Sequence, residues 1–453
     1  MAKVEVLQVA PVEFDRSQLE GFHLDAPRPG DLIDAYSLEL AGWVLGRRAP
    51  VKAVEAKHLG RVIRRAEVWM PRGDALPLTE RAFNRLSAAV RGCTRLLGPV
   101  SPRAATERRN CGFMLSVNLI GLPAECELEL QAVLADESVV PLAIVRARHA
   151  ALRPTYQPRR QPILVSGLGR CGTTWLMHLL AEHPAIVLHQ RYPFESLGAI
   201  HTMRHFQVLT TPANAVRHAD IRALIESIES IGPMPLYCRA EDPAMHAWLR
   251  KEYVEHFADF ALRLNDLIYD EVARPQGKLD CPYFSEKCQG GKLVDASLFM
   301  ELYAAAKEIF LVRDFRDATC SHAAFKQKLG ERNTGVDEGF LRHQQQLTHF
   351  LLAHWQSRRT TAHLVHYEDL VLRPIPTLQA IFTYLGIDDS TSAVETVLHQ
   401  ASTSEIGLEN HLTAPDPVQS IGRWRHDLPL DLQQKCNELL ADALEEFGYA
   451  RAA

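Results

Sequence analysis

The first 150 residues alternate between hydrophobic and polar positions in short runs. These runs begin at Tyr36, Val51, Phe113, Glu127 and Val139. Gly, Pro and Asp interrupt the pattern between runs. A period of two places successive side chains on opposite faces, so the runs are typical of strands with one buried face. We therefore expect residues 1–150 to form a small all-β sandwich.

Residues 151–160 are predicted to form a linker, and a different pattern begins after them. They lie in the stretch HAALRPTYQPRRQP, residues 149–162, which is rich in Pro and Arg and has no apolar periodicity. Residues 161–453 then contain repeated units in which a short apolar strand, a polar or glycine-rich turn and a helix follow one another. Such units predict one α/β domain, with a mostly parallel sheet flanked by helices.

Three of these units are especially distinct. In the first, the strand PILVSG runs to Gly167, and a glycine loop leads into a helix that begins at Thr173. In the second, the strand IFLV precedes a polar turn and a helix. In the third, the strand HLVHYEDL precedes RPIPTLQAIFTYLG, which has Pro near the helix start and Gly386 after its end.

Composition limits the partners of the chain. With 453 residues, 47% of them hydrophobic, it can bury more than one core. A net charge of −5 gives no general attraction to nucleic acid or to an anionic membrane, so an anion site must be local. The first 20 residues lack an apolar stretch of signal-peptide length, and no apolar run reaches membrane-spanning length. We expect a cytoplasmic protein without stable membrane insertion.

The nine cysteines are scattered and include no CxxC pair. This spacing predicts reduced thiols and no zinc site.

Residues 167–176, GLGRCGTTWL, have the glycine spacing of a phosphate-binding loop. In nucleoside triphosphate enzymes a Lys follows the second glycine, and the next hydroxyl binds Mg²⁺. Here Thr173 takes the position of that Lys. Backbone N–H groups at the helix start can still bind an anion, and the Arg170 guanidinium can bind two of its oxygens. The loop is therefore predicted to hold a phosphate or sulfate rather than a Mg-triphosphate.

Two segments together resemble sulfotransferases that use 3′-phosphoadenosine 5′-phosphosulfate (PAPS). GLGRCGTTWL is similar to the family's 5′-phosphosulfate loop. VRDFRDATCS is similar to its 3′-phosphate segment, in which Arg313 and Ser321 have the family's spacing. HYEDLVLRP and SIGRWRHDL extend the similarity over roughly residues 161–450. The resemblance implies a P-loop-like sulfotransferase fold, and PAPS, which is anionic at two positions of its ribose, requires two cationic turns.

The resemblance also assigns the contacts to the donor. Those to the 5′-phosphosulfate come from Gly167, Arg170, Cys171, Gly172, Thr173 and Thr174. Arg170 would also counter charge on the leaving phosphate. Arg313 and Ser321 would hold the 3′-phosphate, with Arg423 as a further phosphate ligand. Cys171 replaces the Ser that is commonest in the loop, so only its backbone contact carries over.

Trp175 stands where some family members stack a Trp on the adenine, although core packing explains it equally well. The segment VRDFRDATCS also contains Arg316 and Asp317, which we expect to form a local ion pair that shapes the turn. Tyr367, at the end of the third strand, is explained by packing or helix entry.

Sulfuryl transfer needs a base near the acceptor. HQRYPFES offers Glu195 and His189, and we select Glu195 because it follows a Tyr-Pro turn, although a role as a polar loop residue explains each of them too. In FSEKCQ, Lys287 would contact the transferring group and Glu286 would orient it, with solvated surface charge as the alternative.

The sequence thus predicts transfer of the sulfuryl group of PAPS, without a metal, to a hydroxyl or amine. The acceptor class stays open among carbohydrates, lipids and small natural products, with the sandwich favouring a carbohydrate or glycoconjugate by analogy alone. Oligomeric state also stays open. One alternative, a Mg-dependent P-loop phosphotransferase, conflicts with the missing loop Lys. The other, a non-catalytic glycan-binding protein, conflicts with the intact set of Arg170, Arg313 and Ser321.

Overall fold

The structure is a computed structural model. It describes residues 2–72, 110–212, 243–289, 293–331, 335–403, 412–414 and 416–449. The chain divides into two compact units. The N-terminal unit comprises residues 1–153 and 205–258, and the C-terminal unit comprises residues 154–204 and 259–453. The sequence pattern did not separate residues 205–258 from the rest of the α/β region.

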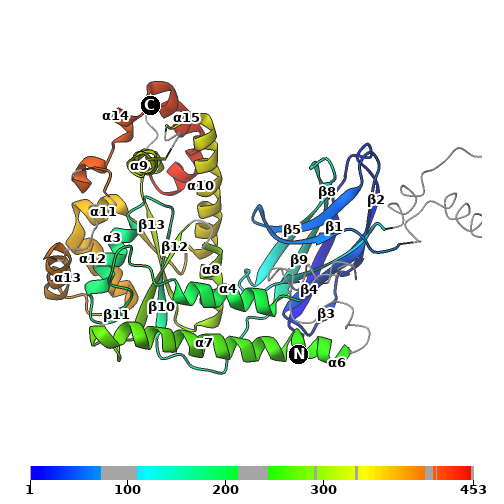
Figure 1. Cartoon of the computed structure of the whole chain (residues 1–453), viewed down its shortest axis with the longest axis horizontal. Coiled ribbons are helices and arrows are strands. Elements are labelled where there is room, and N and C mark those ends of the chain that lie inside the picture. Colours follow the sequence, from blue (N-terminus) through cyan, green and yellow to red (C-terminus); the bar gives the residue numbers. More distant parts are fainter. Residues whose placement is uncertain are drawn as a thin grey trace, which may run out of the picture. The chain divides into compact units, whose positions relative to one another are not determined.

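The N-terminal unit contains two antiparallel sheets with strand orders β3-β1-β9-β8-β5-β6 and β2-β4-β7 (Figure 1). The strands are β1 Val4–Pro11, β2 Leu19–Ala26, β3 Leu32–Ile33, β4 Ser37–Gly46, β5 Val51–His58, β6 Arg61–Glu67, β7 Gly112–Asn118, β8 Glu125–Leu134 and β9 Val139–His149. Alternate residues of both sheets, such as Leu38 and Leu40 of β4 and Leu128 and Leu130 of β8, meet in one core. The predicted β-sandwich is confirmed.

The C-terminal unit contains a five-stranded sheet in the order β11-β12-β10-β13-β14, in which every neighbouring pair is parallel. The strands are β10 Gln161–Gly167, β11 Ile186–Val187, β12 Tyr283–Gln289, β13 Lys307–Val312 and β14 His363–His366. The predicted parallel α/β sheet is confirmed. Its central strand, β10, leads directly into the glycine loop.

Helices cover both faces of this sheet (Figure 1). Those of the described chain are α3 Thr173–Glu182, α4 Gly198–Thr210, α6 Pro243–Leu249, α7 Glu252–Ala273, α8 Leu293–Leu302, α9 Phe315–Lys328, α10 Glu338–Arg358, α11 Tyr367–Leu372, α12 Pro374–Leu385, α13 Thr391–Thr403, α14 Trp424–Asp427, α15 Leu430–Leu439 and α16 Ala441–Glu446, with 3₁₀ turns at Arg274–Gln276 and Pro417–Ser420. α3, α12 and α13 share a core with Ile163 and Ile309, whereas α9, α10 and α16 share one with Phe310 and Val312. None of the described helices is long and apolar enough to cross a membrane.

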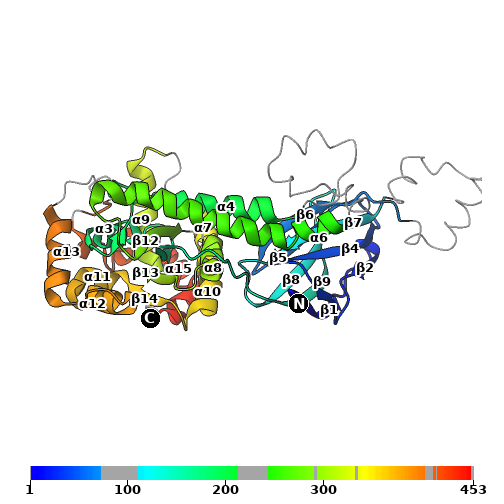
Figure 2. The ribbon, with the colours of Figure 1, turned by 90° about the horizontal axis from the view of Figure 1, so that it is seen from below.

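α4 and α7 each contain residues of both units, and they lie side by side (Figure 2). Gly198 permits their close approach, because a Cβ atom there would lie 2.9 Å from Ile268 Cγ2. Within the N-terminal unit, the rings of Phe206 and Phe257 lie 6.1 Å apart.

Residues at the starts of β1 and β4 bind the start of α7 and the residues before it. Glu255 accepts hydrogen bonds from Lys3 Nζ at 3.0 Å and from the Tyr36 hydroxyl at 2.8 Å. Arg250 donates to the hydroxyl of Ser37 at 2.9 Å and to its carbonyl at 2.7 Å. These contacts explain why residues from the middle of the chain belong to the N-terminal unit.

The stretch predicted as a linker is bound to α7. The backbone N–H groups of Thr155 and Tyr156 donate to Asp259 Oδ1 at 2.8 and 2.9 Å. The Tyr156 hydroxyl donates to Asp266 at 2.8 Å, and Asp270 pairs with the arginines that follow. The three carboxylates are spaced by seven and four residues, which places them along one face of the helix.

Candidate active site

The two glycines that define the loop stand where a side chain would collide with a neighbouring strand or ring. A Cβ atom at Gly167 would lie 2.6 Å from the carbonyl oxygen of Leu311 in β13. Gly172, with φ of 92°, caps the N-terminus of α3, and a Cβ atom there would overlap the ring of Tyr367. The loop therefore requires glycine at both positions, and it directs the first N–H groups of α3 away from the helix body.

Arg170 lies in the same loop, with φ of 71° in the left-handed region. Its Nε donates to Ser321 Oγ at 3.2 Å, and its guanidinium lies 4.3 Å from the centre of the Phe325 ring. Burial, together with the positive charge of Arg313, lowers the pKa of Arg170 to about 10. The group stays protonated at neutral pH, and two neighbouring cations favour an anion between them.

Arg313 follows β13, and its guanidinium is fixed by backbone oxygens. Nη1 donates to the carbonyl of Arg170 at 3.1 Å and Nη2 donates to the carbonyl of Ser420 at 2.5 Å. The guanidinium lies 4.6 Å from the centre of the Tyr367 ring. Among the described residues the buried Nε has no hydrogen-bond partner, so this donor is available to a ligand.

Ser321 and Arg423 are linked through Thr413. Ser321 Oγ lies 3.0 Å from Thr413 Oγ1, which also accepts a hydrogen bond from Arg423 Nη1 at 3.1 Å. Arg423 Nε donates to Asp427 at 2.6 Å. With the Arg170 contact to Ser321, these bonds join residues from the glycine loop, α9 and the turn before α14.

A pocket of about 230 Å³ opens among these side chains. It is lined by Arg170, Gly172, Thr173, Thr174, Trp175, Arg313, Ser321, Tyr367, Leu412, Thr413, Ala414, Pro417 and Ser420. Most of the predicted donor contacts thus surround one space. Gly167, Cys171 and Arg423 do not line it. Cys171 is fully buried, and burial raises the pKa of its thiol to about 12, so the side chain is neutral.

Tyr367 and Ser420 line the pocket although the sequence had assigned neither of them a role in the site. Tyr367 packs under Gly172 and against Arg313, and its hydroxyl lies 3.2 Å from Ser420 Oγ. Both residues lie in segments that carry the resemblance, HYEDLVLRP and SIGRWRHDL. The resemblance of HYEDLVLRP to a family segment was the signal that could have identified Tyr367.

Lys287 and Glu195 meet beside the donor loop. Lys287 Nζ lies 2.6 Å from Glu195 Oε1 and donates to Thr174 Oγ1 at 2.9 Å. The lysine is buried and the glutamate side chain is 17% exposed. His189 is partly exposed and does not line the pocket.

Glu286 points to the other side of β12 from Lys287, because successive strand residues alternate. Its carboxylate accepts hydrogen bonds from the backbone N–H groups of Leu197 and Ala199, at 3.2 and 3.1 Å, and from the Tyr269 hydroxyl at 2.6 Å. Burial raises the pKa of this carboxyl group. Glu286 thus supports the loop that follows the predicted base, and the prediction that it orients Lys287 is wrong.

The expected ion pair between Arg316 and Asp317 does not form. Arg316 instead pairs with Asp314, with Nη2 donating to Oδ2 at 2.7 Å. Asp317 accepts hydrogen bonds from backbone N–H groups of the segment around Arg423. Within the part of the chain that the structure describes, no cluster of three or more His, Cys, Asp or Glu side chains is placed to hold a metal ion.

Residues 162–391, just over half of the chain, match the model of the Sulfotransferase family. The chain belongs to the sulfotransferase family. The matched region of this sulfotransferase begins in β10 and includes the glycine loop, β12, β13 and α9. A comparison with curated proteins found no significant match.

Solved structures similar to this sulfotransferase include a sulfotransferase from Mycobacterium avium, at 15% identity over 65% of this chain and 78% of that chain, with a TM-score of 0.35. The sulfotransferase domain of the Synechococcus PCC 7002 olefin synthase is 21% identical over 66% of this chain and 98% of its own, with a TM-score of 0.35. A mouse sulfotransferase complexed with PAP is 12% identical over 64% of this chain and 87% of its own, with a TM-score of 0.34.

Proposed function

We propose that the protein transfers the sulfuryl group of PAPS to a hydroxyl or amine of an acceptor. One observation carries the proposal: the Arg170 guanidinium of the glycine loop donates to Ser321 of α9 at 3.2 Å, so two anion-binding turns share one pocket. A nucleotide with anionic groups at two positions of one ribose fits such a pair of turns.

The donor contacts follow from this arrangement. The start of α3, with Thr173 and Thr174, presents N–H groups and a helix dipole to the 5′-phosphosulfate. Arg313 offers its buried Nε to the 3′-phosphate beside Ser321. Trp175 lines the same pocket and offers an indole face to the adenine. Arginines and backbone amides supply the positive charge, so we propose that donor binding needs no metal.

In the chemical step, the acceptor oxygen or nitrogen forms a bond to sulfur while the bond between sulfur and the 5′-phosphate oxygen breaks. The acceptor's proton passes to the Glu195 carboxylate. Lys287 Nζ contacts both Glu195 and Thr174 at the start of α3, and this pair of contacts supports a role for its ammonium between the proposed base and the donor. Arg170 and Lys287 stabilise the negative charge that develops on the leaving nucleotide.

For the acceptor we propose a carbohydrate or glycoconjugate, with residues 1–150 as an accessory domain and residues 161–453 as the transferase domain. The support is analogy, because accessory β-sandwiches accompany many enzymes that act on such substrates. Lipids and small natural products are the other classes that an acceptor screen has to include.

The test is calorimetric titration of adenosine 3′,5′-bisphosphate (PAP) without added metal. The parent should bind, and Arg170→Ala and Arg313→Ala should abolish binding. Arg373→Ala, at an exposed arginine that pairs with Asp369, should bind like the parent. A folded parent that does not bind PAP would overturn the proposal.

A screen with PAPS and a panel of sugars, lipids and amines should then show transfer. Mg-dependent ATP turnover would identify a phosphotransferase instead. PAP binding without transfer to any acceptor, together with sugar binding by the sandwich, would identify a glycan-binding protein.

A further inference from the structure

The segment that precedes and begins α14, residues 416–424, forms one wall of the pocket, and we refer to it as the C-terminal turn. Residues of the β13–α9 segment hold it in three places. Arg313 donates to the carbonyl of Ser420, the Arg316 guanidinium lies 4.0 Å from the centre of the Trp424 ring, and Asp317 binds the backbone. The motif VRDFRDATCS therefore supplies both ligand contacts and supports for the turn.

Asp317 holds the C-terminal turn by two hydrogen bonds to its backbone. Its Oδ2 accepts a hydrogen bond from the N–H of Gly422 at 2.6 Å, and its Oδ1 accepts one from the N–H of Trp424 at 3.0 Å. These two residues flank Arg423 in the sequence. Because both neighbours of Arg423 are bound to one buried carboxylate, the backbone that carries the arginine is fixed relative to α9.

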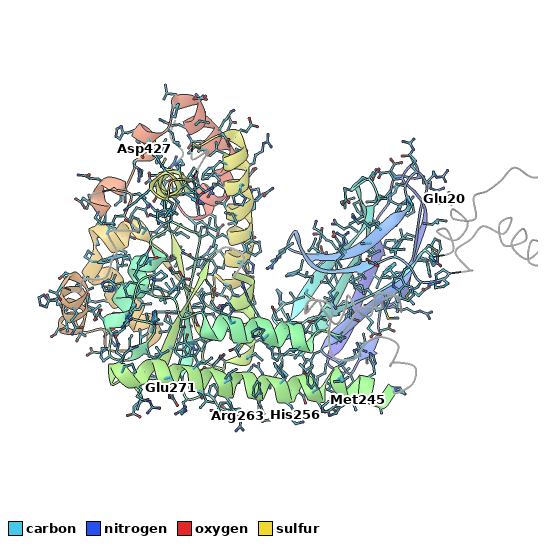
Figure 3. All side chains as sticks on the ribbon, viewed as in Figure 1. Glu20, Met245, His256, Arg263, Glu271 and Asp427 are labelled. Carbon is cyan, nitrogen blue, oxygen red and sulfur yellow. The ribbon has the colours of Figure 1, made fainter. Side chains whose placement is uncertain are left out.

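The position of Asp317 on α9 explains why this residue can play that role. Asp317 and Ser321 are four residues apart on α9, so they lie along one side of the helix, and Arg313 precedes the helix at the end of β13. Arg423 Nε donates to Asp427, the residue at the end of α14 that is labelled in Figure 3. Arg423 Nη1 reaches Thr413, which contacts Ser321. Asp317 is thereby connected to the proposed 3′-phosphate contacts without lining the pocket itself.

A carboxylate suits this position better than an amide. Two backbone N–H groups point at Asp317, and a carboxylate accepts from both, whereas Asn has one oxygen and would turn an NH₂ group toward the second N–H. Burial raises the pKa of Asp317 to about 6, and the two N–H bonds lower it. At neutral pH the group is ionised and can accept both bonds. The buried charge is retained in spite of its desolvation cost.

We propose that Asp317 is a positioning residue for Arg423 and that, through it, Asp317 sets the preference of the site for nucleotides that carry a 3′-phosphate. This inference rests on the proposed function. It assigns to Asp317 an effect on the 3′-phosphate end of the nucleotide, because Arg423 donates to Thr413 and Thr413 contacts Ser321.

The experiment compares the affinities of PAP and of adenosine 5′-monophosphate (AMP), which lacks the 3′-phosphate, by direct and competition calorimetry. Asp317→Asn should weaken PAP binding at least tenfold and change AMP binding less than about twofold. The matched control is Tyr384→Phe, which also removes two hydrogen bonds to backbone groups, those of Glu308 and Thr361, away from the pocket. It should leave the ratio of the two affinities unchanged.

Arg423→Met provides a second variant that tests the route. It should reproduce the loss of PAP affinity. The double variant Asp317→Asn/Arg423→Met should lose little more PAP affinity than either single variant, because both changes remove the same proposed contact, that of Arg423 with the 3′-phosphate. Additive losses would contradict an action of Asp317 through Arg423.

The outcomes separate this inference from the proposed function. A parent that binds PAP no better than AMP would refute the proposed function. A parent that prefers PAP, with Asp317→Asn keeping that preference within threefold, would refute the role of Asp317 and leave the function standing. An equal loss of both ligands would show a merely structural role and would also refute the inference.

Discussion

Arg313→Lys tests the most specific feature of the pocket, the fixed guanidinium. Arg313 donates to two carbonyl oxygens, at 3.1 and 2.5 Å, packs on Tyr367 and keeps Nε for a ligand. Lysine preserves the charge but cannot keep a planar fork on two carbonyls while it offers a further donor. The variant should therefore lose at least one charge-assisted hydrogen bond to the 3′-phosphate.

Such a bond contributes about 1.5 to 3 kcal/mol, which corresponds to about 10- to 150-fold in the dissociation constant of PAP. Calorimetry should show this loss for PAP and a change of less than about threefold for AMP. Arg358→Lys is the matched control, since Arg358 lies in the same unit, is mostly buried, and pairs with Glu308 at 3.9 Å outside the pocket. If Arg313→Lys bound PAP within threefold of the parent, the assignment of Arg313 to the 3′-phosphate would be wrong.

Three further predictions concern the base, the adenine and pH. Glu195→Gln should leave PAP affinity within about twofold and reduce the rate of transfer at least about 100-fold, measured with PAPS and an acceptor found by the screen. Trp175→Ala should weaken PAP binding about 5- to 150-fold if the indole stacks on the adenine, and a smaller change measured by calorimetry would assign it to the core. Burial is the main cause that raises the pKa of Asp317 to about 6, and Asp314 also raises it, while the N–H bonds and Arg313 lower it. In the unfolded chain the pKa of this carboxyl group is near 3.8. Because the folded form binds the proton more tightly, ionisation of Asp317 costs stability as pH rises from about 4 to 6, by about 3 kcal/mol in total. The free energy of unfolding of the parent should fall over this range relative to that of Asp317→Asn, and parallel pH profiles in denaturant titrations would contradict the assignment.

The elements with strong local signals could be predicted from the sequence. Alternation located β4, β5, β7, β8 and β9, and apolar runs beside glycine or polar turns located β10, β13 and the helices after them. The pocket lies where two such turns meet. In a parallel sheet the carboxyl ends of the strands share one edge, and ligands bind there. Each turn follows a strand, so each could be assigned to this edge from its own sequence.

Features that depend on distant partners could not be predicted. The stretch at Thr155 has the composition of a linker, but its partner Asp259 lies 104 residues later, and nothing local indicates it. Glu286 and Lys287 are adjacent in sequence and were predicted to act together, although the strand period already places their side chains on opposite faces. Arg316 was predicted to pair with Asp317 but pairs with Asp314. Both aspartates are close to Arg316 along the chain, so the sequence alone does not distinguish them.

The most direct test of the central claim is a crystal structure of the protein grown with PAP. The account predicts the 5′-phosphate at the start of α3 beside Thr173 and Arg170, and the 3′-phosphate between Arg313 and Ser321, within hydrogen-bond distance of Arg313 Nε. Density for PAP elsewhere on the protein, or a pocket that stays empty at saturating PAP, would contradict it.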